Sequence, residues 1–287
     1  FDGSNDLITI PNSSTYNYTT SSAFTIEAWV KINASATSIN TIVGKKTPGG
    51  GSSGYAFYIN SWGTSDRKVV FETTTGTFVS TTSISNNTWT HVAVSVASGG
   101  TATIYINGVA SGTGNITIPS NSNTLNIGAF GNNNYFYFNG SLDEVRVWDV
   151  AKSATELNNY KNTDVTGASN LALYYKFNEG TGSIVNDKST NLNNGSLVNF
   201  ALAGSTSNWV SSNFQDTAVI TGNSRMCIGS TTSLTHAVSG GTWTSASTNV
   251  ATIDPSTGVV TGVAVGTSVI NYNYTYNGCT FSDTFTL

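Results

Sequence analysis

The stretch that decides the fold is GSLDEVRVWD, residues 140–149. Asp143, Val145 and Val147 alternate in it with Glu144, Arg146 and Trp148. A period of two residues is typical of a β-strand, because successive side chains point to opposite faces. The alternation therefore predicts a strand with one apolar face that carries a single carboxylate, Asp143, at its start.

Charge is concentrated in this strand. Charged residues make up only 9% of the chain, yet Asp143, Glu144, Arg146 and Asp149 fall within ten residues. This density favours a site in which the charged side chains are held in place, rather than a solvated face. The alternative is an exposed strand whose charges pair across to neighbouring strands.

The same stretch carries a family resemblance. Followed by AKSATEL (151–157), it resembles the closing strand and short helix of LamG-like, concanavalin A-type jelly roll domains. Three more stretches fit that pattern: FDGSND (1–6), FTIEAWV (24–30) and WTHVA (89–93). The resemblance covers roughly residues 1–200 and implies two antiparallel sheets, often a bound calcium, and frequently glycan or protein binding. A fold of this kind does not fix one function.

The chain is long enough for two domains. It has 287 residues and is rich in Ser, Thr, Asn and Gly, a balance that favours all-β structure with polar loops. A composition shift near 205–217 suggests a boundary. We expect a two-sheet antiparallel jelly roll sandwich over 1–213 and a smaller C-terminal Ig-like β-sandwich over 214–287.

The C-terminal part resembles bacterial Ig-like (BIG2-type) modules found in tandem on surface adhesins. The resemblance rests on GGTWTS (240–245), VATID (250–254), TGVVTG (257–262) and VGTSVI (265–270). It implies a small sandwich with a buried Trp243 that serves as a spacer.

Local signals mark individual elements. Asn107-Gly108 suits a tight type I′ turn, and Ser153 with Glu156 forms a capping box for a helix over 153–161. Residues 171–200 either close the first sandwich or begin an incomplete second repeat. The first alternative is favoured, because an unpaired apolar strand would promote aggregation.

Charge and hydropathy limit the partners. The net charge is −4 and the pI about 5.0, which disfavours nucleic acid or an anionic membrane as a partner. No apolar run approaches the roughly 20 residues that span a bilayer. The chain begins at Phe1 rather than Met, so we expect a piece of a longer protein.

Catalytic patterns are weak. Glu27 could act as an acid, but the LamG-like resemblance implies a structural acid there, and His91 lies in a Trp-x-His motif that the resemblance also makes structural. The remaining histidine, His236, lies in the other module. No Glu-x-Asp-x-x-Glu triplet occurs for retaining glycosidase chemistry, and the Gly-rich run 48–54 lacks the lysine of a phosphate loop. We expect no enzymatic activity.

Calcium binding is the more credible chemistry. By the jelly roll resemblance, Asp143 is a candidate Ca²⁺ ligand, with Asp2 and Asp6 as helpers and nearby carbonyls completing the shell. Alternatively, Asp2 and Asp6 form Asx turns, and Asp143 pairs with Arg146 or a lysine. Asp187 with Asn191 is a second candidate.

Glycan binding requires exposed rings and hydrogen-bonding amides or carboxylates. Candidate ligand-binding residues that offer these groups are Trp62, Tyr55, Tyr58, Asn132, Asn133, Asn134 and Tyr135. The alternative is that the aromatic residues are ordinary core or strand-edge positions.

The two cysteines, Cys227 and Cys279, both lie in the C-terminal module and are predicted to form a disulfide. Such a bond would close a long loop, stabilise the module by roughly 4 kcal/mol in the chain-entropy model, and place the protein outside the cytosol.

Together these features predict a non-catalytic segment of a secreted or cell-surface bacterial adhesin, of the kind that suits gliding or biofilm-forming bacteria. The jelly roll would bind extracellular polysaccharide or a host or surface glycan, and neighbouring modules of the same chain would flank it. The alternatives are a spacer without a ligand and an accessory module of a polysaccharide-degrading enzyme.

Overall fold

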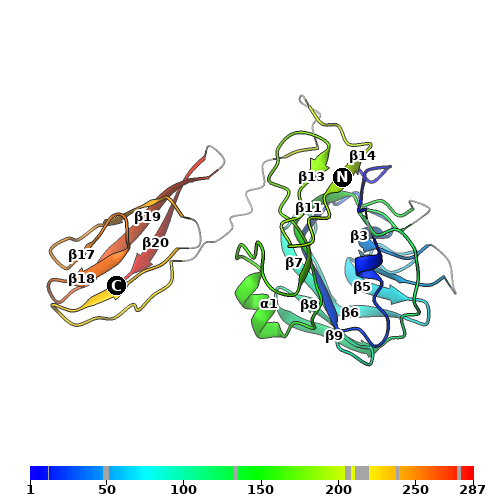
Figure 1. The fold of residues 1–287 in the computed structure, drawn as a ribbon, viewed down its shortest axis with the longest axis horizontal. Helices are drawn as coiled ribbons and strands as arrows, with labels where there is room; N and C mark the ends of the chain where they lie inside the picture. Colours follow the sequence, from blue (N-terminus) through cyan, green and yellow to red (C-terminus); the bar gives the residue numbers. More distant parts are fainter. Residues whose placement is uncertain are drawn as a thin grey trace. The chain divides into compact units, whose positions relative to one another are not determined.

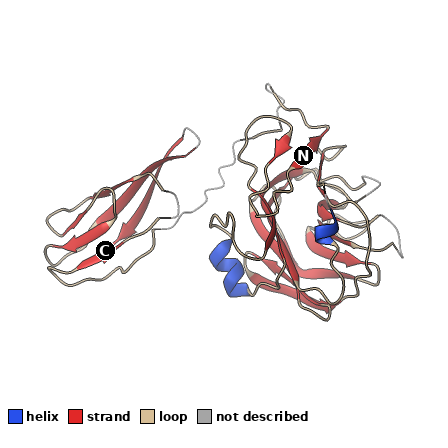
Figure 2. Ribbon diagram, viewed as in Figure 1, coloured by secondary structure: helices blue, strands red, loops and turns tan. Residues whose placement is uncertain are grey.

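A computed structural model describes residues 1–11, 13–47, 52–131, 135–203, 208–210, 220–236, 239–276 and 279–287. The chain divides into two compact units, one that contains Phe1–Lys161 and Val165–Phe214 and one that contains Gln215–Leu287 (Figure 1). Strands dominate both units, and the described helices are short (Figure 2). The chain is therefore all-β.

The first unit contains two antiparallel sheets. The eight-stranded sheet has the order β13 (Ile184–Val185), β14 (Gly195–Val198), β1 (Leu7–Thr9), β10 (Asn126–Ile127), β3 (Asn40–Gly44), β4 (Tyr55–Ile59), β5 (Lys68–Thr73) and β6 (Thr77–Ser83). The six-stranded sheet has the order β12 (Leu171–Tyr175), β11 (Gly140–Trp148), β2 (Phe24–Ile32), β7 (Thr90–Val96), β8 (Thr101–Ile106) and β9 (Val109–Asn115). This two-sheet sandwich confirms the predicted fold class and is consistent with a jelly roll.

The main core lies between the two sheets. On β2, the alternating residues Phe24, Ile26, Ala28 and Val30 are all fully buried in it. Alternate side chains of a strand share one face, so this run is the inward face of β2. The predicted alternation over 24–30 is confirmed.

The strand over residues 140–148 differs from its predicted alternation. Leu142, Val145 and Val147 belong to the core, whereas Asp143 does not. The pairing of β11 with β2 shifts register between Asp143 and Arg146, and Glu144 has φ = +50°. An extra residue in one strand reverses the alternation beyond it. The prediction that Asp143 shares the apolar face of Val145 is therefore wrong.

Residues 171–200 close the first sandwich. β12 pairs with β11 at the edge of one sheet, and β14 pairs with β1 in the other. The carboxylate of Asp187 accepts hydrogen bonds from Tyr174 N, Ser189 N, Ser189 Oγ and Asn193 N. These contacts make Asp187 a structural acceptor that ties β12 to the following turn, and they do not support it as a calcium ligand.

Two short helical segments accompany the sheets: η1 (Ser13–Tyr16) and α1 (Ala154–Tyr160). The predicted capping box of α1 is present, with Ser153 and Glu156 bonded to each other's backbone amides. Asn107 and Gly108 have φ values of +51° and +78°, as a type I′ turn requires. A Cβ on Gly108 would lie 2.1 Å from Asn158 Oδ1, so glycine also lets α1 approach this turn.

The second unit contains two three-stranded antiparallel sheets. One has the order β15 (Thr231–Ser233), β18 (Val259–Gly262) and β17 (Ala251–Ile253); the other has the order β16 (Thr242–Ser245), β19 (Val269–Tyr276) and β20 (Cys279–Thr286). Trp243, Val260 and Ile270 are buried together between them. The buried Trp243 agrees with the expectation for this module, and its Ig-like assignment stays a prediction.

Among the described residues, no helix reaches the length and apolarity needed to cross a membrane.

Candidate functional site

The loop between β4 and β5 projects an aromatic side chain into solvent. Trp62 is 72% exposed. Behind it, the carboxylate of Asp66 accepts hydrogen bonds from Ser61 N (3.0 Å), Ser61 Oγ (2.7 Å) and Lys68 N (3.2 Å). Burial alone would raise the pKa of Asp66, but these hydrogen bonds hold it below its usual value. The ionised carboxylate of Asp66 thus holds the two ends of the loop together.

The two ends of the loop are fixed to a neighbouring segment. Asn60 and Arg67 both adopt positive φ, +73° and +59°. Asn60 Nδ2 donates to Ser38 O (2.7 Å), and Arg67 Nη2 donates to Ala34 O (3.0 Å). Left-handed backbone costs free energy for residues other than glycine, so the surrounding contacts must maintain it. Trp62 is therefore presented by a preorganised loop.

A row of aromatic rings supports Trp62. Its ring lies 5.5 Å from that of Phe136, which lies 5.2 Å from Phe130, which in turn lies 5.8 Å from Tyr58. Tyr135, 55% exposed, lies beside Phe136 at 6.3 Å. We refer to Trp62, Tyr135 and Phe136 as the aromatic surface.

Phe136 is held in an unusual backbone conformation. Its φ is +61°, which is rare for a bulky residue. Its carbonyl accepts hydrogen bonds from Thr41 N (3.2 Å) and Thr41 Oγ1 (2.7 Å) on β3. These bonds fix the ring of Phe136 against Trp62.

A polar group lies beneath the row of rings. Tyr58 OH donates to Glu72 Oε2 (2.7 Å), and Lys46 Nζ lies 3.0 Å from Glu72 Oε1. Burial, together with the charge of Glu72, raises the pKa of Tyr58 above its usual range. Lys46 and Tyr58 are buried, so this group fixes the support of the aromatic surface rather than contacting solvent.

The predicted ligand-binding residues differ in their exposure to solvent. Trp62 and Tyr135 are exposed and lie together around Phe136. Tyr55 and Tyr58 are 0% and 1% exposed, so neither ring can stack on a ligand. The prediction is wrong for these two: Tyr55 points into the main core, and Phe130 covers Tyr58.

The remaining predicted ligand-binding residues, Asn132, Asn133 and Asn134, lie outside the described residues. Phe136 was missed as a candidate. The aromatic run Tyr135–Phe138, with rings on both parities, was the signal that could have indicated it.

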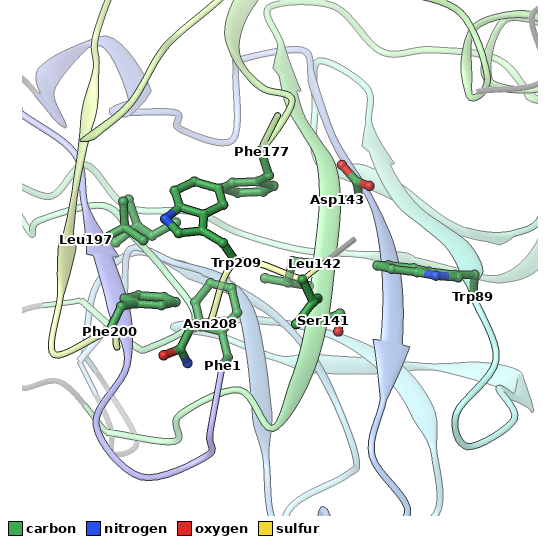
Figure 3. Close-up of a pocket in the computed structure, with 12 residues that line it drawn as sticks. Phe1, Trp89, Ser141, Leu142, Asp143, Phe177, Leu197, Phe200, Asn208 and Trp209 are labelled. Atoms are coloured by element: carbon green, nitrogen blue, oxygen red, sulfur yellow. The ribbon is translucent and has the colours of Figure 1, made fainter. Parts of the chain in front are cut away.

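A small pocket opens between the sheets elsewhere on the first unit (Figure 3). Phe177 and Trp209 form one wall and Trp89 stands on the opposite side, with Leu142 and Asp143 of β11 between them. Its volume is about 70 Å³, room for a few water molecules or one small group. The aromatic surface differs from this pocket in presenting an indole that is 72% exposed to solvent.

The three predicted calcium ligands lie around this pocket. Asp143 lines it, and Asn208, which also lines it, donates to Asp6 Oδ2 (2.8 Å). Asp2 forms an Asx turn by accepting from Ser4 N (2.8 Å), and its own N–H donates to Asp6 Oδ2 (3.0 Å). Burial, followed by the charge of Asp2, raises the pKa of Asp6.

In this arrangement Asp2 and Asp6 already act as hydrogen-bond acceptors. Within the described part of the chain, no group of three or more His, Cys, Asp and Glu side chains could hold a metal ion. Calcium binding by Asp143, Asp2 and Asp6 would require side chains to move together, and it stays a prediction.

Glu27 lies in a sealed ion network on the six-stranded sheet. Glu27 Oε2 lies 2.9 Å from His91 Nε2, Trp148 Nε1 donates to Oε1 at 2.8 Å, and Arg146 Nη1 lies 3.6 Å from Oε1. Burial would raise the pKa of Glu27, but His91 and Arg146 hold it at about 2. All four side chains are buried, so this carboxylate serves structure.

Arg146 links this ion network to helix α1. It donates to Tyr160 O (2.7 Å) at the end of α1 and pairs with the carboxylate of Glu144. Trp29 Nε1 donates to Lys161 O (2.8 Å). The charge density of residues 140–149 therefore marks the place where α1 is fastened to the sheet.

The cysteines of the second unit are only partly described. Cys227 is exposed and carries a free thiol in the structure. The side chain of Cys279 lies outside the described residues, so the disulfide stays a prediction.

The first unit is a two-sheet antiparallel β-sandwich. A family model described as the concanavalin A-like lectin/glucanases superfamily, of laminin G type, matches residues 2–158. The chain belongs to this superfamily. None of the curated proteins matches the chain.

Several solved structures are similar to this chain. A candidate carbohydrate-binding protein from Bacteroides ovatus ATCC 8483 is 26% identical with a TM-score of 0.55, and the match covers 68% of this chain and 56% of that one. This chain thus spans little more than half of that protein. The CBM40 of the Ruminococcus gnavus IT-sialidase, bound to α2,3-sialyllactose, is 18% identical with a TM-score of 0.43, and the match covers 52% and 86% of the two chains. A SAP-like pentraxin from Limulus polyphemus is 16% identical with a TM-score of 0.36, over 55% and 82%.

Proposed function

We propose that the first unit binds carbohydrate through the aromatic surface. The observation that carries this proposal is the 72% exposed indole of Trp62 on a loop hydrogen-bonded at both ends. An aromatic face can stack on the apolar face of a sugar ring. A rigid loop loses little conformational freedom on binding, so more of the contact free energy appears as affinity.

The comparisons support carbohydrate as the class of ligand. Membership of a lectin and glucanase superfamily makes carbohydrate a natural ligand, and the Bacteroides ovatus relative is itself a candidate carbohydrate-binding protein. Fold alone does not assign function, so the argument depends on the surface.

The proposed binding is non-catalytic. Glu27 and His91 are sealed in the ion network, and His236 Nε2 lies 2.8 Å from Asp283 in the second unit with its side chain buried. Neither Glu27 nor His91 can reach a polysaccharide chain at the aromatic surface without leaving its present partners.

We further propose that the chain is a segment of a secreted or cell-surface bacterial adhesin whose second unit acts as a spacer between neighbouring modules. The Ser-, Thr- and Asn-rich composition and the two cysteines of the second unit support this setting. A spacer without a ligand predicts no carbohydrate binding that depends on Trp62. An accessory module of a polysaccharide-degrading enzyme would use the same surface, and the sequence of the parent protein distinguishes the two settings.

The test is binding of residues 1–287 to a panel of soluble polysaccharides by affinity gel electrophoresis. We expect retardation by at least one polymer and loss of most of it in Trp62→Ala, since stacking on one aromatic ring is worth about 1 kcal/mol or more. Val109→Ala, at another exposed apolar residue, is the matched control and should bind normally. Loss of binding in Trp89→Ala but not in Trp62→Ala would move the site to the pocket of Figure 3.

A further inference from the structure

We infer that the carbohydrate bound at the aromatic surface is uncharged, an inference that rests on the proposed function. The observation behind it is the state of the charged side chains around Trp62. An acidic sugar needs cationic donors that are open to it, because a carboxylate or sulfate must replace the water it loses with hydrogen bonds.

Arg67, the cation closest to Trp62 along the chain, is turned into the protein. Its Nη1 donates to Ala36 O and to Asn60 Oδ1 (3.2 Å), and its Nη2 donates to Ala34 O (3.0 Å). Its Nε donates to Asn86 Oδ1. Every nitrogen of the guanidinium group thus has a protein acceptor, and the group anchors the loop.

The two nearby lysines are also directed elsewhere. Lys46 is buried and paired with Glu72, and its Nζ donates to Ser52 Oγ (2.8 Å). Lys68 points along the sheet to Thr81 O (3.5 Å) on β6, the edge strand. Recruiting Lys46 would mean breaking its ion pair with Glu72, and Lys68 is directed towards β6.

The charged residue nearest to Trp62 along the chain is acidic. Asp66 closes the loop, and its hydrogen bonds from Ser61 and Lys68 favour the ionised form. An anionic ligand stacked on Trp62 would therefore find Asp66 ionised and each guanidinium nitrogen of Arg67 already bonded to a protein acceptor.

The neighbouring segments add no charge of their own. Among the described residues, the sequence has no Asp, Glu, Lys or Arg in 33–41 or in 135–142. These runs consist mainly of Asn, Ser, Thr, Gly and aromatic residues, whose amide and hydroxyl groups suit neutral hydroxyl groups. The geometry points to a neutral hexose or pentose polymer as the ligand.

The experiment compares neutral polymers (β-glucan, xylan, mannan, dextran) with acidic ones (alginate, polygalacturonate, hyaluronan) by affinity gel electrophoresis of residues 1–287. The panel is run at low (about 20 mM) and high (about 500 mM) NaCl, because screening weakens charge pairing and leaves stacking nearly unchanged. We expect a neutral polymer to bind with a Kd that changes less than about twofold with salt, and every acidic polymer to bind at least about tenfold more weakly.

The Trp62→Ala variant distinguishes a wrong binding site from a wrong ligand class. If an acidic polymer binds best, weakens strongly with salt and depends on Trp62, then the proposed function stands and the neutral ligand is wrong. If no polymer binds, or binding does not depend on Trp62, then the proposed site itself is wrong and the neutral inference is overturned with it.

Discussion

Trp62 and Phe136 meet edge to face, with ring centroids 5.5 Å apart and ring planes at 79°. The contact joins the loop after β4 to a segment far along the chain, between β10 and β11. It leaves the indole exposed while fixing its direction.

The first prediction concerns this contact. Phe136→Leu keeps an apolar side chain but removes the ring, and we expect the affinity for carbohydrate to fall about 3- to 10-fold, the worth of one aromatic pair. Isothermal titration calorimetry measures it. Phe177→Leu, the same change at a half-buried ring of the pocket, is the control. Equal losses in both variants would show a general effect of stability.

A second prediction concerns the loop that presents Trp62. Asp66→Ala removes the acceptor of three hydrogen bonds from Ser61 and Lys68. We expect affinity to fall about tenfold, because the loop must then be ordered on binding. Asp254→Ala, which removes an acceptor from Ser256 N and Thr257 N in the second unit, should leave binding unchanged. Unaltered affinity in Asp66→Ala would contradict the preorganised loop.

The third prediction is a pH dependence of stability. The pKa of Glu27 is about 2 in the folded protein against 4.5 for an ordinary glutamate. A depressed carboxyl pKa stabilises the folded state above the unfolded pKa, and this stability is lost as the pH falls from about 4.5 towards 2. Urea unfolding of the wild type should show a falling free energy of unfolding over that interval.

The variant Glu27→Gln isolates this contribution. At pH 7 it leaves the buried Arg146 without one of its carboxylate neighbours, so we expect a loss of about 3–5 kcal/mol. The difference from the wild type should shrink as the pH approaches 2, where Glu27 becomes protonated. A difference that stays constant down to that pH would mean that the carboxyl is not ionised at neutral pH.

The fourth prediction tests calcium. If Asp143, Asp2 and Asp6 bind the ion, saturating CaCl₂ will stabilise the first unit relative to EDTA by about 2–3 kcal/mol at a hundredfold excess over Kd. Differential scanning calorimetry measures the shift, and Asp143→Asn should abolish it. Identical Tm values in calcium and EDTA would contradict calcium binding by these residues.

The fifth prediction tests the disulfide. Thiol titration of the denatured protein after purification without reductant should find neither Cys227 nor Cys279 free. Reduction should then lower the stability of the second unit by roughly 4 kcal/mol. Two reactive thiols in the unreduced protein would show that the cysteines are unpaired.

Local sequence was sufficient for much of the architecture. The alternation of 24–30 specified β2, Asn107-Gly108 specified a tight turn, and Ser153 with Glu156 specified the start of α1. These signals act over a few residues, through the side-chain period and through local hydrogen bonds. The edge strands β6 and β9 are harder to recognise, because runs such as TFVSTTS and VASGTGN alternate poorly.

The all-β class, most strand positions and the candidacy of Trp62 and Tyr135 follow from local patterns in the sequence. Which of the candidate rings reach solvent depends on how the chain packs. Tyr58 lies on the outward face of β4, yet Phe130, far along the chain, covers it. The register shift after Asp143 likewise depends on pairing with β2. Exposure and register depend on contacts between distant segments, and these form only when the sheets assemble.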